Sequence, residues 1–330
     1  MNTLKPKSKR PISPGHRACA GCGELLAART VTEALGSDII VTNATGCLEV
    51  TTTPYPESSW GMPWIHSLFE NAASVASGIR AAIDYQNKHS KQPRKIKVVA
   101  QGGDGGTFDI GIGQISGMWA RGDDVLYICY DTEAYSNTGV QASGATPWGA
   151  NTTTTPAGMS INKNDASYID GVGSHQRKKD MLAIALAHGL DYVAQTTAGF
   201  PTDITQKVQK ALTIPGPGYI QIASPCVPGW KTDPSDTIKL GKLAAQTGLY
   251  PVIEYVNGKL VNAMKVPTPQ IKVEEYLKLQ SRFSHLFKNE AGKKEIERIQ
   301  SFADANIAKY GLAETPQKIA IPSITEEVKK

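Results

Sequence analysis

Hydrophobic and polar positions along the chain change repeatedly between the spacing of a helix and that of a buried strand. Residues 23–35 have helical spacing and stop at Gly36, a residue that commonly ends helices. Further helices are predicted over 67–85 and 180–189, and a helical stretch that follows the glycines after residue 101 is predicted to run to Arg121. Strands are predicted over 38–44, 96–101, 125–131, 192–196 and 218–224. Strands separated by helices of this length predict βαβ units, and therefore a doubly wound, mostly parallel α/β sheet with helices on both faces.

Two regions depart from this alternation. Residues 132–160 are rich in Ser, Thr, Gly, Asn and Pro and directly follow a central strand. Ligands of open α/β sheets bind beyond the carboxyl ends of the strands, so this long loop is predicted to be functional. After residue 224, Asn257-Gly258 lies between two apolar runs and predicts a tight hairpin, and residues 273–310 are interpreted as two charged, amphipathic helices.

These patterns predict one α/β domain with an extension at its carboxyl end. The predicted parts are a basic amino-terminal arm over 1–18, the α/β domain over 19–230, a hairpin and helical extension over 231–310, and a mobile tail over 311–330. The chain has 330 residues, of which 40% are hydrophobic and 20% charged, and this ordinary globular composition excludes a disordered or fibrous protein.

Charge and hydropathy narrow the class of protein further. The longest apolar runs are of strand length, well short of the roughly 18 residues of a membrane span, and the basic amino terminus lacks the apolar core of a secretory signal. We therefore expect a cytoplasmic protein without a membrane span. The net charge of +5 comes largely from the amino-terminal arm, which lacks the interleaved aromatics of a nucleic-acid-binding segment and is interpreted as solvated or docking.

The 5 cysteines are the first sign of specific chemistry. Cys129 lies within the predicted strand 125–131 and is interpreted as a buried apolar residue. The other four lie at predicted helix or strand ends, which can meet at one edge of a doubly wound sheet: Cys19, Cys22, Cys47 and Cys226. Four thiolates fit a zinc ion or a [4Fe–4S] cluster, and the presence of only one local Cys-x-x-Cys pair weakly favours iron–sulfur.

A glycine-rich segment, Gly102-Gly-Asp-Gly-Gly-Thr-Phe-Asp109, follows the predicted strand 96–101. It is not a dinucleotide-binding fingerprint, because Phe108 stands where the third glycine is required. Glycines let a backbone approach a diphosphate, and Asp104 offers a hard oxygen ligand for Mg²⁺, although Gly-Asp-Gly also fills ordinary turns. One βα unit later, the Thr132 hydroxyl and a carbonyl near Ala134 are placed to reach the same cation. Oxygen ligands at two adjacent strand ends are the arrangement of a thiamine diphosphate site.

Taken together, six short motifs resemble the β subunit of multi-subunit pyruvate:ferredoxin oxidoreductases, over residues 15–287. The motifs are Cys19-Ala-Gly-Cys-Gly-Glu24, Thr45-Gly-Cys-Leu-Glu49, Pro63-Trp-Ile-His-Ser67, Gly103-Asp-Gly-Gly-Thr107, Tyr135-Ser-Asn-Thr-Gly139 and Ser224-Pro-Cys226. The resemblance implies that residues 19–230 form a thiamine-diphosphate-binding fold that also carries a [4Fe–4S] cluster. It assigns the cluster to Cys19, Cys22, Cys47 and Cys226, which favours iron–sulfur over zinc.

The resemblance also implies roles around the cofactor. The implied Mg²⁺ ligands are Asp104, Thr132 and the Ala134 carbonyl, and the implied cofactor-binding residues further include Gly103, Gly105, Gly106 and Asn137. Many relatives carry Asn where Thr132 stands, and both side chains offer a neutral oxygen. Asn137 is implied to lie beside the reacting carbon and Glu24 near the cofactor. From the residues alone, Glu24 is equally a first-turn helix carboxylate and Asn137 a turn residue.

The implied function is oxidative decarboxylation of pyruvate with coenzyme A to acetyl-CoA and CO₂, a reversible reaction whose electrons pass through the cluster to ferredoxin. The implied partners are α, γ and δ subunits, and the α subunit is expected to supply the glutamate that activates the cofactor. This chain alone is therefore expected to be inactive. Two alternatives stay open, the same machinery acting on oxalate or a branched-chain 2-oxoacid, and a zinc-stabilised, non-catalytic scaffold subunit.

Overall fold

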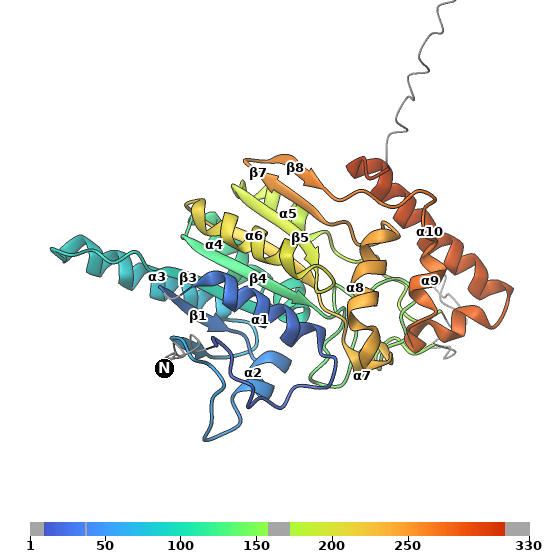
Figure 1. Ribbon diagram of the computed structural model, residues 1–330, viewed down its shortest axis with the longest axis horizontal. Helices are drawn as coiled ribbons and strands as arrows, with labels where there is room; N and C mark the ends of the chain where they lie inside the picture. Colours follow the sequence, from blue (N-terminus) through green and yellow to red (C-terminus); the bar gives the residue numbers. More distant parts are fainter. Residues whose placement is uncertain (1–9, 37, 158–171, 314–330) are drawn as a thin grey trace, which may run out of the picture.

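The computed structural model describes residues 10–36, 38–157 and 172–313, which form an eight-stranded sheet flanked by helices (Figure 1). In sheet order, the strands are β2 (Trp64–His66), β1 (Ile39–Asn43), β3 (Lys97–Gly103), β4 (Val125–Asp131), β6 (Gly218–Ala223), β5 (Tyr192–Thr197), β7 (Ile253–Val256) and β8 (Lys259–Ala263). The first six run parallel to one another, and β7 pairs antiparallel with both β5 and β8. This confirms the predicted doubly wound, mostly parallel sheet.

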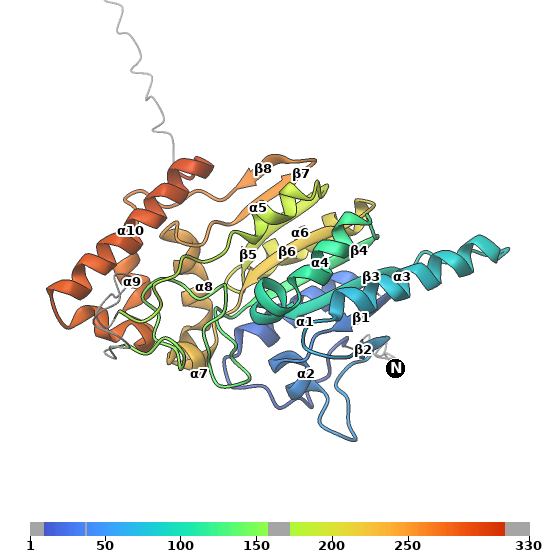
Figure 2. The same cartoon turned by 180° about the vertical axis from the view of Figure 1, so that it is seen from behind.

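Helices cover both faces of the sheet (Figures 1 and 2). One face carries α1 (Gly23–Leu35) and α6 (Pro201–Thr213), and the other carries α3 (Ala72–His89), α4 (Ile112–Ala120) and α5 (Met181–Ala187). Side chains of β4 alternate between the two cores, with Tyr127 and Cys129 on the α3 face and Ile128 and Tyr130 on the α1 face. Cys129 is fully buried among apolar side chains, as predicted.

Two helices differ from their predicted bounds. The helix expected over 67–85 begins only at Ala72, because the Asn71 side chain accepts the Leu68 N–H at 2.9 Å and closes a turn before the helix. The helical stretch predicted to run to Arg121 consists of a π-helix over Gly105–Ile110 and of α4, which follows Gly111. Short π-helical turns are frequent at functional sites, and this one directly follows Asp104.

The carboxyl-terminal part adds to the same sheet. The predicted hairpin forms between β7 and β8, with Asn257 and Gly258 both at positive φ, and β7 pairs with β5. The two predicted helices are three pieces, α9 (Val273–Leu277), a 3₁₀ helix η3 (Ser281–Phe287) and α10 (Glu290–Tyr310). They pack on the short helices α7 (Val227–Trp230) and α8 (Thr237–Gln246).

Residues 1–9 of the predicted arm, 158–160 of the predicted long loop and 314–330 of the predicted tail lie outside the described residues, as do residues 37 and 161–171. Within the described ranges, none of the helices is both long enough and apolar enough to cross a lipid bilayer.

Candidate functional site

A recess at the carboxyl ends of β1, β3 and β4 gathers the sequence-predicted cofactor residues. Its lining includes Glu24, Cys47, Gly103, Asp104, Gly105, Gly106, Thr132, Ala134 and Asn137. The adjacent strands β3 and β4 end at Gly103 and Asp131, so Asp104 and Thr132 both stand one residue beyond the sheet. The enclosed part of the recess is only about 30 Å³, so a ligand of cofactor size must extend across its mouth.

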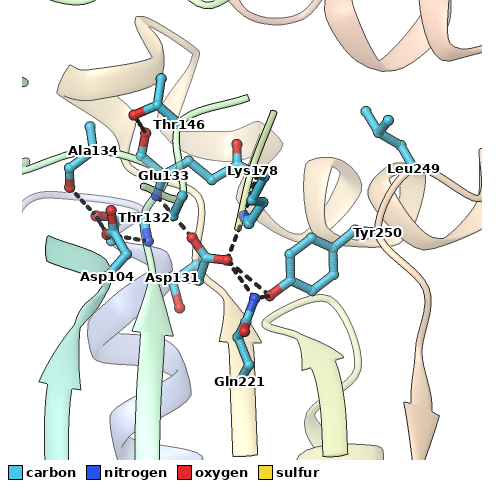
Figure 3. A network of polar contacts seen from close by, with 12 residues as sticks. Asp104, Asp131, Thr132, Glu133, Ala134, Thr146, Lys178, Gln221, Leu249 and Tyr250 are labelled. Carbon is cyan, nitrogen blue, oxygen red and sulfur yellow. Dashed lines mark hydrogen bonds and ion pairs between the residues drawn. The ribbon is translucent and has the colours of Figure 1, made fainter. Parts of the chain in front are cut away.

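Three oxygen atoms of different chemistry converge at this edge (Figure 3). The Thr132 hydroxyl lies 2.9 Å from Asp104 Oδ1 and 3.1 Å from the Ala134 carbonyl oxygen. Neighbouring ligands of an octahedral Mg²⁺ with bonds of about 2.0–2.1 Å lie about 3 Å apart. The carboxylate, hydroxyl and carbonyl therefore fit one side of a Mg²⁺ coordination shell, the set predicted from the sequence.

Asp104 is held rigidly and away from water. Its side chain is 1% exposed and accepts hydrogen bonds from the Thr132 N–H at 3.1 Å and from the Ser143 hydroxyl at 2.5 Å. Burial, and then the nearby charge of Asp131, raise the pKa of Asp104 to about 7, against the hydrogen bonds from Ser143 and Thr132. A bound divalent cation would keep this carboxyl ionised. Ser143 was not predicted, and its only signal in the sequence is its place in the polar loop after β4.

Two glycines after β3, Gly105 and Gly106, pack so closely against neighbouring atoms that no side chain would fit there. A Cβ atom at Gly105 would lie 2.4 Å from the ring of Tyr135, and one at Gly106 would lie 2.9 Å from the Phe69 carbonyl oxygen. The Tyr135 ring stacks on Phe69 with centroids 5.7 Å apart, so it has little freedom to withdraw. This close packing explains why the two positions directly after Asp104 are glycines.

A second, adjacent recess is lined by all four cysteines predicted as metal ligands. Cys22 caps α1, Cys47 begins the short helix α2 (Cys47–Thr52), Cys226 precedes α7, and Cys19 lies in the turn before α1. In the part of the chain that the structure describes, no three His, Cys, Asp or Glu side chains meet at the spacing of a single-ion site. A zinc ion would draw its thiolates to about 2.3 Å from one point, whereas an iron–sulfur cluster spreads its ligands around several metal atoms.

The cysteine turn is fixed by close backbone packing. Gly21 has φ of 70°, and a Cβ there would lie 2.3 Å from the Pro234 carbonyl oxygen. A Cβ at Gly23 would lie 2.6 Å from the nitrogen of Pro225, the residue before Cys226. Any side chain at Gly21 or Gly23 would collide with this backbone. The turn that holds Cys19 and Cys22 beside Cys226 therefore requires glycine at both positions.

Burial favours the protonated form of three of the four thiols, those of Cys22, Cys47 and Cys226. Burial first, and then the charge of Glu24, raise the pKa of Cys22 to about 12, and the same two causes raise the pKa of Cys47. Burial also raises the pKa of Cys226. Metal ligation needs the thiolate form, so only a bound cationic centre would hold these side chains ionised.

Glu24 joins the two recesses, because its side chain lines both. It is 6% exposed, and burial, followed by the charge of Asp104, raises its pKa to about 8. Cys47, Thr132 and Ser136 also line both recesses, so the oxygen-rich and sulfur-rich sites share a wall. Asn137 is exposed at the mouth, where its side chain partly offsets the rise in the pKa of the Cys47 thiol.

A larger cavity of about 290 Å³ lies behind Glu133 and Lys178. It is lined by none of the residues that the sequence predicts as ligands or cofactor contacts, and its size alone is weaker evidence for chemistry than the convergence of ligand atoms described above.

Comparisons with known proteins agree with this geometry. The family described as thiamine pyrophosphate enzyme, C-terminal TPP binding domain, matches residues 44–222. Pyruvate synthase subunit PorB of Methanocaldococcus jannaschii is 49% identical over 303 residues, covering 91% of this chain and 96% of that protein. The PorB subunit of Methanosarcina barkeri is 49% identical over 312 residues, covering 94% of this chain and 100% of that protein.

Two further similarities are informative. The ketoisovalerate oxidoreductase subunit VorB of Pyrococcus abyssi is 40% identical over 280 residues, covering 84% of this chain and 86% of that protein. A solved structure of 2-oxoglutarate:ferredoxin oxidoreductase from Magnetococcus marinus, with 2-oxoglutarate, coenzyme A and succinyl-CoA bound, superposes with a TM-score of 0.54 at 23% identity. It covers 88% of this chain and 98% of that chain, and shows that the two share a fold.

Proposed function

Since the chain belongs to the family of the pyruvate synthase PorB subunits, within the thiamine pyrophosphate enzymes, we propose that it binds thiamine diphosphate, Mg²⁺ and one [4Fe–4S] cluster in a 2-oxoacid:ferredoxin oxidoreductase. The observation that carries this proposal is the wall shared by the oxygen-rich and the cysteine-lined recess. A cofactor in the first and a cluster in the second would lie next to each other, as electron transfer between them requires.

The residues of this chain have distinct roles in the proposal. Asp104, Thr132 and the Ala134 carbonyl hold Mg²⁺, and the backbone at Gly103, Gly105 and Gly106 receives the diphosphate. The four thiolates of Cys19, Cys22, Cys47 and Cys226 hold the cluster. Thiamine diphosphate, when bound, supplies the electron sink on which a 2-oxoacid loses CO₂.

Glu24 and Asn137 act between the two sites in this proposal. Glu24 lies in the wall that both recesses share, where burial raises the pKa of its carboxyl to about 8 and the Leu48 backbone N–H favours the ionised form. Its role in the proposal is to place a polar side chain between the cofactor and the cluster. Asn137 presents a neutral amide at the mouth of the oxygen-rich recess, close to Cys47, and orients the substrate there.

Pyruvate is the proposed substrate, with coenzyme A as co-substrate, because the relatives at 49% identity are pyruvate synthase subunits. A branched-chain 2-oxoacid is the second candidate, since VorB at 40% identity is a ketoisovalerate oxidoreductase subunit. The proposed partners are α, γ and δ subunits and ferredoxin, and the shallow recess needs an α subunit to complete the cofactor site. We propose that the complex works in an oxygen-poor cytoplasm, because the cluster would lie close to the protein surface, where Cys19 is exposed.

Anaerobic purification of the native complex tests this function. We expect thiamine diphosphate, Mg²⁺, iron and acid-labile sulfide in the complex, and ferredoxin reduction that is faster with pyruvate than with 2-oxoisovalerate or oxalate. Faster reduction with 2-oxoisovalerate would move the assignment to the second candidate. A colourless complex that contains zinc and no thiamine diphosphate would contradict the catalytic assignment and favour a scaffold subunit.

The close packing at Gly105 gives a second prediction. Gly105→Ala places a methyl group against the Tyr135 ring, and overpacking of this kind costs about 1–3 kcal/mol. Because the displaced backbone receives the diphosphate, we expect thiamine diphosphate to bind about tenfold more weakly or worse. Gly113→Ala is the matched control, because Gly113 lies in α4 with open space around its Cβ position and alanine stabilises helices. Titration of the cofactor-depleted complexes measures both. Equal affinity in the two variants would contradict a close backbone approach at Gly105.

A further inference from the structure

Glu133 stands between Thr132 and Ala134, the two proposed Mg²⁺ ligands that follow β4, in an unusual backbone conformation. Its φ of 60° lies in the left-handed region, which costs a non-glycine residue about 1 kcal/mol or more. The turn that this conformation makes brings the Thr132 hydroxyl to 3.1 Å from the Ala134 carbonyl oxygen. The surrounding structure must hold Glu133 in place for the two ligands to face Asp104.

The Glu133 side chain is anchored by two cations. It is 5% exposed and accepts hydrogen bonds from Arg282 Nη2 at 2.5 Å and from Lys178 Nζ at 3.1 Å. Lys178 also contacts Asp131 at 2.5 Å, and Asp131 in turn accepts the Glu133 N–H at 3.2 Å (Figure 3). Asp131 is completely buried and receives two more hydrogen bonds, from Gln221 and from Tyr250.

The backbone carbonyls of this turn are also occupied. Trp230 Nε1 donates to the Thr132 carbonyl at 2.8 Å, and the Thr146 hydroxyl donates to the Glu133 carbonyl at 2.8 Å. The Arg282 guanidinium lies 4.1 Å from the centre of the Trp230 ring, so one arginine supports both the side chain and the backbone of the turn. Arg282 belongs to η3, 149 residues after Glu133.

The charges of this group balance. Asp131 and Glu133 oppose Lys178 and Arg282, which avoids the cost of several kcal/mol of burying an unpaired charge. Among the described residues, no lysine, arginine or histidine forms an ion pair with Asp104. The neutral group thus leaves the Asp104 charge available for a cation while it fixes the neighbouring turn.

We propose that Glu133, anchored by Lys178 and Arg282, is a positioning residue that sets the two Mg²⁺ ligands that follow β4, the Thr132 hydroxyl and the Ala134 carbonyl. The inference rests on the proposed function, because it assigns Mg²⁺ to Asp104, Thr132 and Ala134. It gives the carboxyl-terminal extension a role at the cofactor site, through Arg282. The alternative is that these buried ion pairs only stabilise the fold.

Two substitutions that change the charge in opposite directions separate positioning from electrostatics. Glu133→Gln removes a negative charge and Lys178→Met removes a positive one. If the group positions the ligands, both variants raise the apparent Kd of the intact complex for Mg²⁺ by about tenfold or more, as expected for partners that orient metal ligands. If only charge matters, Lys178→Met binds Mg²⁺ more tightly, and that result would overturn the inference.

The control is Lys207→Met, which breaks a buried ion pair of α6, in which Lys207 lies 2.5 Å from Asp203. It is expected to lower Tm without changing the Kd for Mg²⁺, measured by titration of the metal-depleted complex at fixed thiamine diphosphate. Saturating Mg²⁺ should restore kcat in Glu133→Gln to within about twofold, because Glu133 positions ligands and touches no substrate. An equal rise of Kd in Lys207→Met, or no rise in Glu133→Gln, would overturn the inference.

Thr146→Val keeps the test decisive if the charged variants fail to fold, since it changes no charge. It removes the hydrogen bond to the Glu133 carbonyl, together with the one that Thr146 accepts from the Ser143 N–H. It should raise the Kd for Mg²⁺ several-fold, and an unchanged Kd would count against the inference. A wild-type complex that binds no thiamine diphosphate would overturn the proposed function and this inference together. A wild-type complex that binds it, with variants of unchanged Kd, would overturn the inference alone.

Discussion

Complexes that carry Asp104→Ala are expected to lose Mg²⁺-dependent binding of thiamine diphosphate while they retain iron and acid-labile sulfide. Asp104 is the sole charged member of the oxygen set at the ends of β3 and β4, so alanine leaves Thr132 and Ala134 with neutral oxygens alone. A metal ion contributes several kcal/mol in such sites, so kcat/KM should fall by about three orders of magnitude or more. Assays of thiamine, iron and ferredoxin reduction on the same anaerobic preparation measure this.

Asp104→Asn is the matched control, because asparagine keeps the shape of the side chain and an oxygen that accepts the Thr132 N–H. It should bind the cofactor only at raised Mg²⁺ concentration. If Asp104→Ala lost iron and thiamine equally, the domain would have unfolded, and the asparagine variant would carry the test. Wild-type thiamine affinity in Asp104→Ala would contradict the assignment of Asp104 as a metal ligand.

The strands and site residues that could be predicted from the sequence are those set by a local pattern of apolar and polar residues. The parallel strands are short apolar runs, and Asp104 and Thr132 follow such runs directly, so the meeting of their side chains follows from parallel pairing of β3 with β4. The positions of the thiols were predictable for the same reason. They lie at the amino-terminal ends of α1, α2 and α7, which meet at the same edge of the sheet.

The interactions that the sequence did not predict depend on contacts between distant segments. Nothing near Arg282 in the sequence indicates that it would reach Glu133, and nothing near Thr146 indicates that it would hold the Glu133 carbonyl. The three-residue strand β2 was missed because it is short and half exposed. The π-helix after Asp104 was not distinguished from the helical stretch predicted to run to Arg121, because the helical spacing of apolar residues does not indicate how many residues form each turn.

Of all single substitutions, Cys226→Ala is expected to separate the two cofactors most sharply. It removes one proposed cluster ligand, so iron and sulfide should fall by the content of one cluster per chain and ferredoxin reduction should be lost. Thiamine diphosphate and Mg²⁺ should remain, because Cys226 lies outside the recess that Asp104 lines. Iron, sulfide and thiamine assays, with electron paramagnetic resonance of the reduced complex, measure these three results.

Cys129→Ala is the control for this prediction, since it makes the same substitution at a fully buried cysteine in the α3 core. It leaves a small cavity and should cost about 1–2 kcal/mol of stability, with the cluster and ferredoxin reduction intact. A Cys226→Ala complex with its full iron content would contradict ligation by Cys226. Loss of the cluster from Cys129→Ala would contradict the separation of the five cysteines into four ligands and one core residue, on which the iron–sulfur assignment depends.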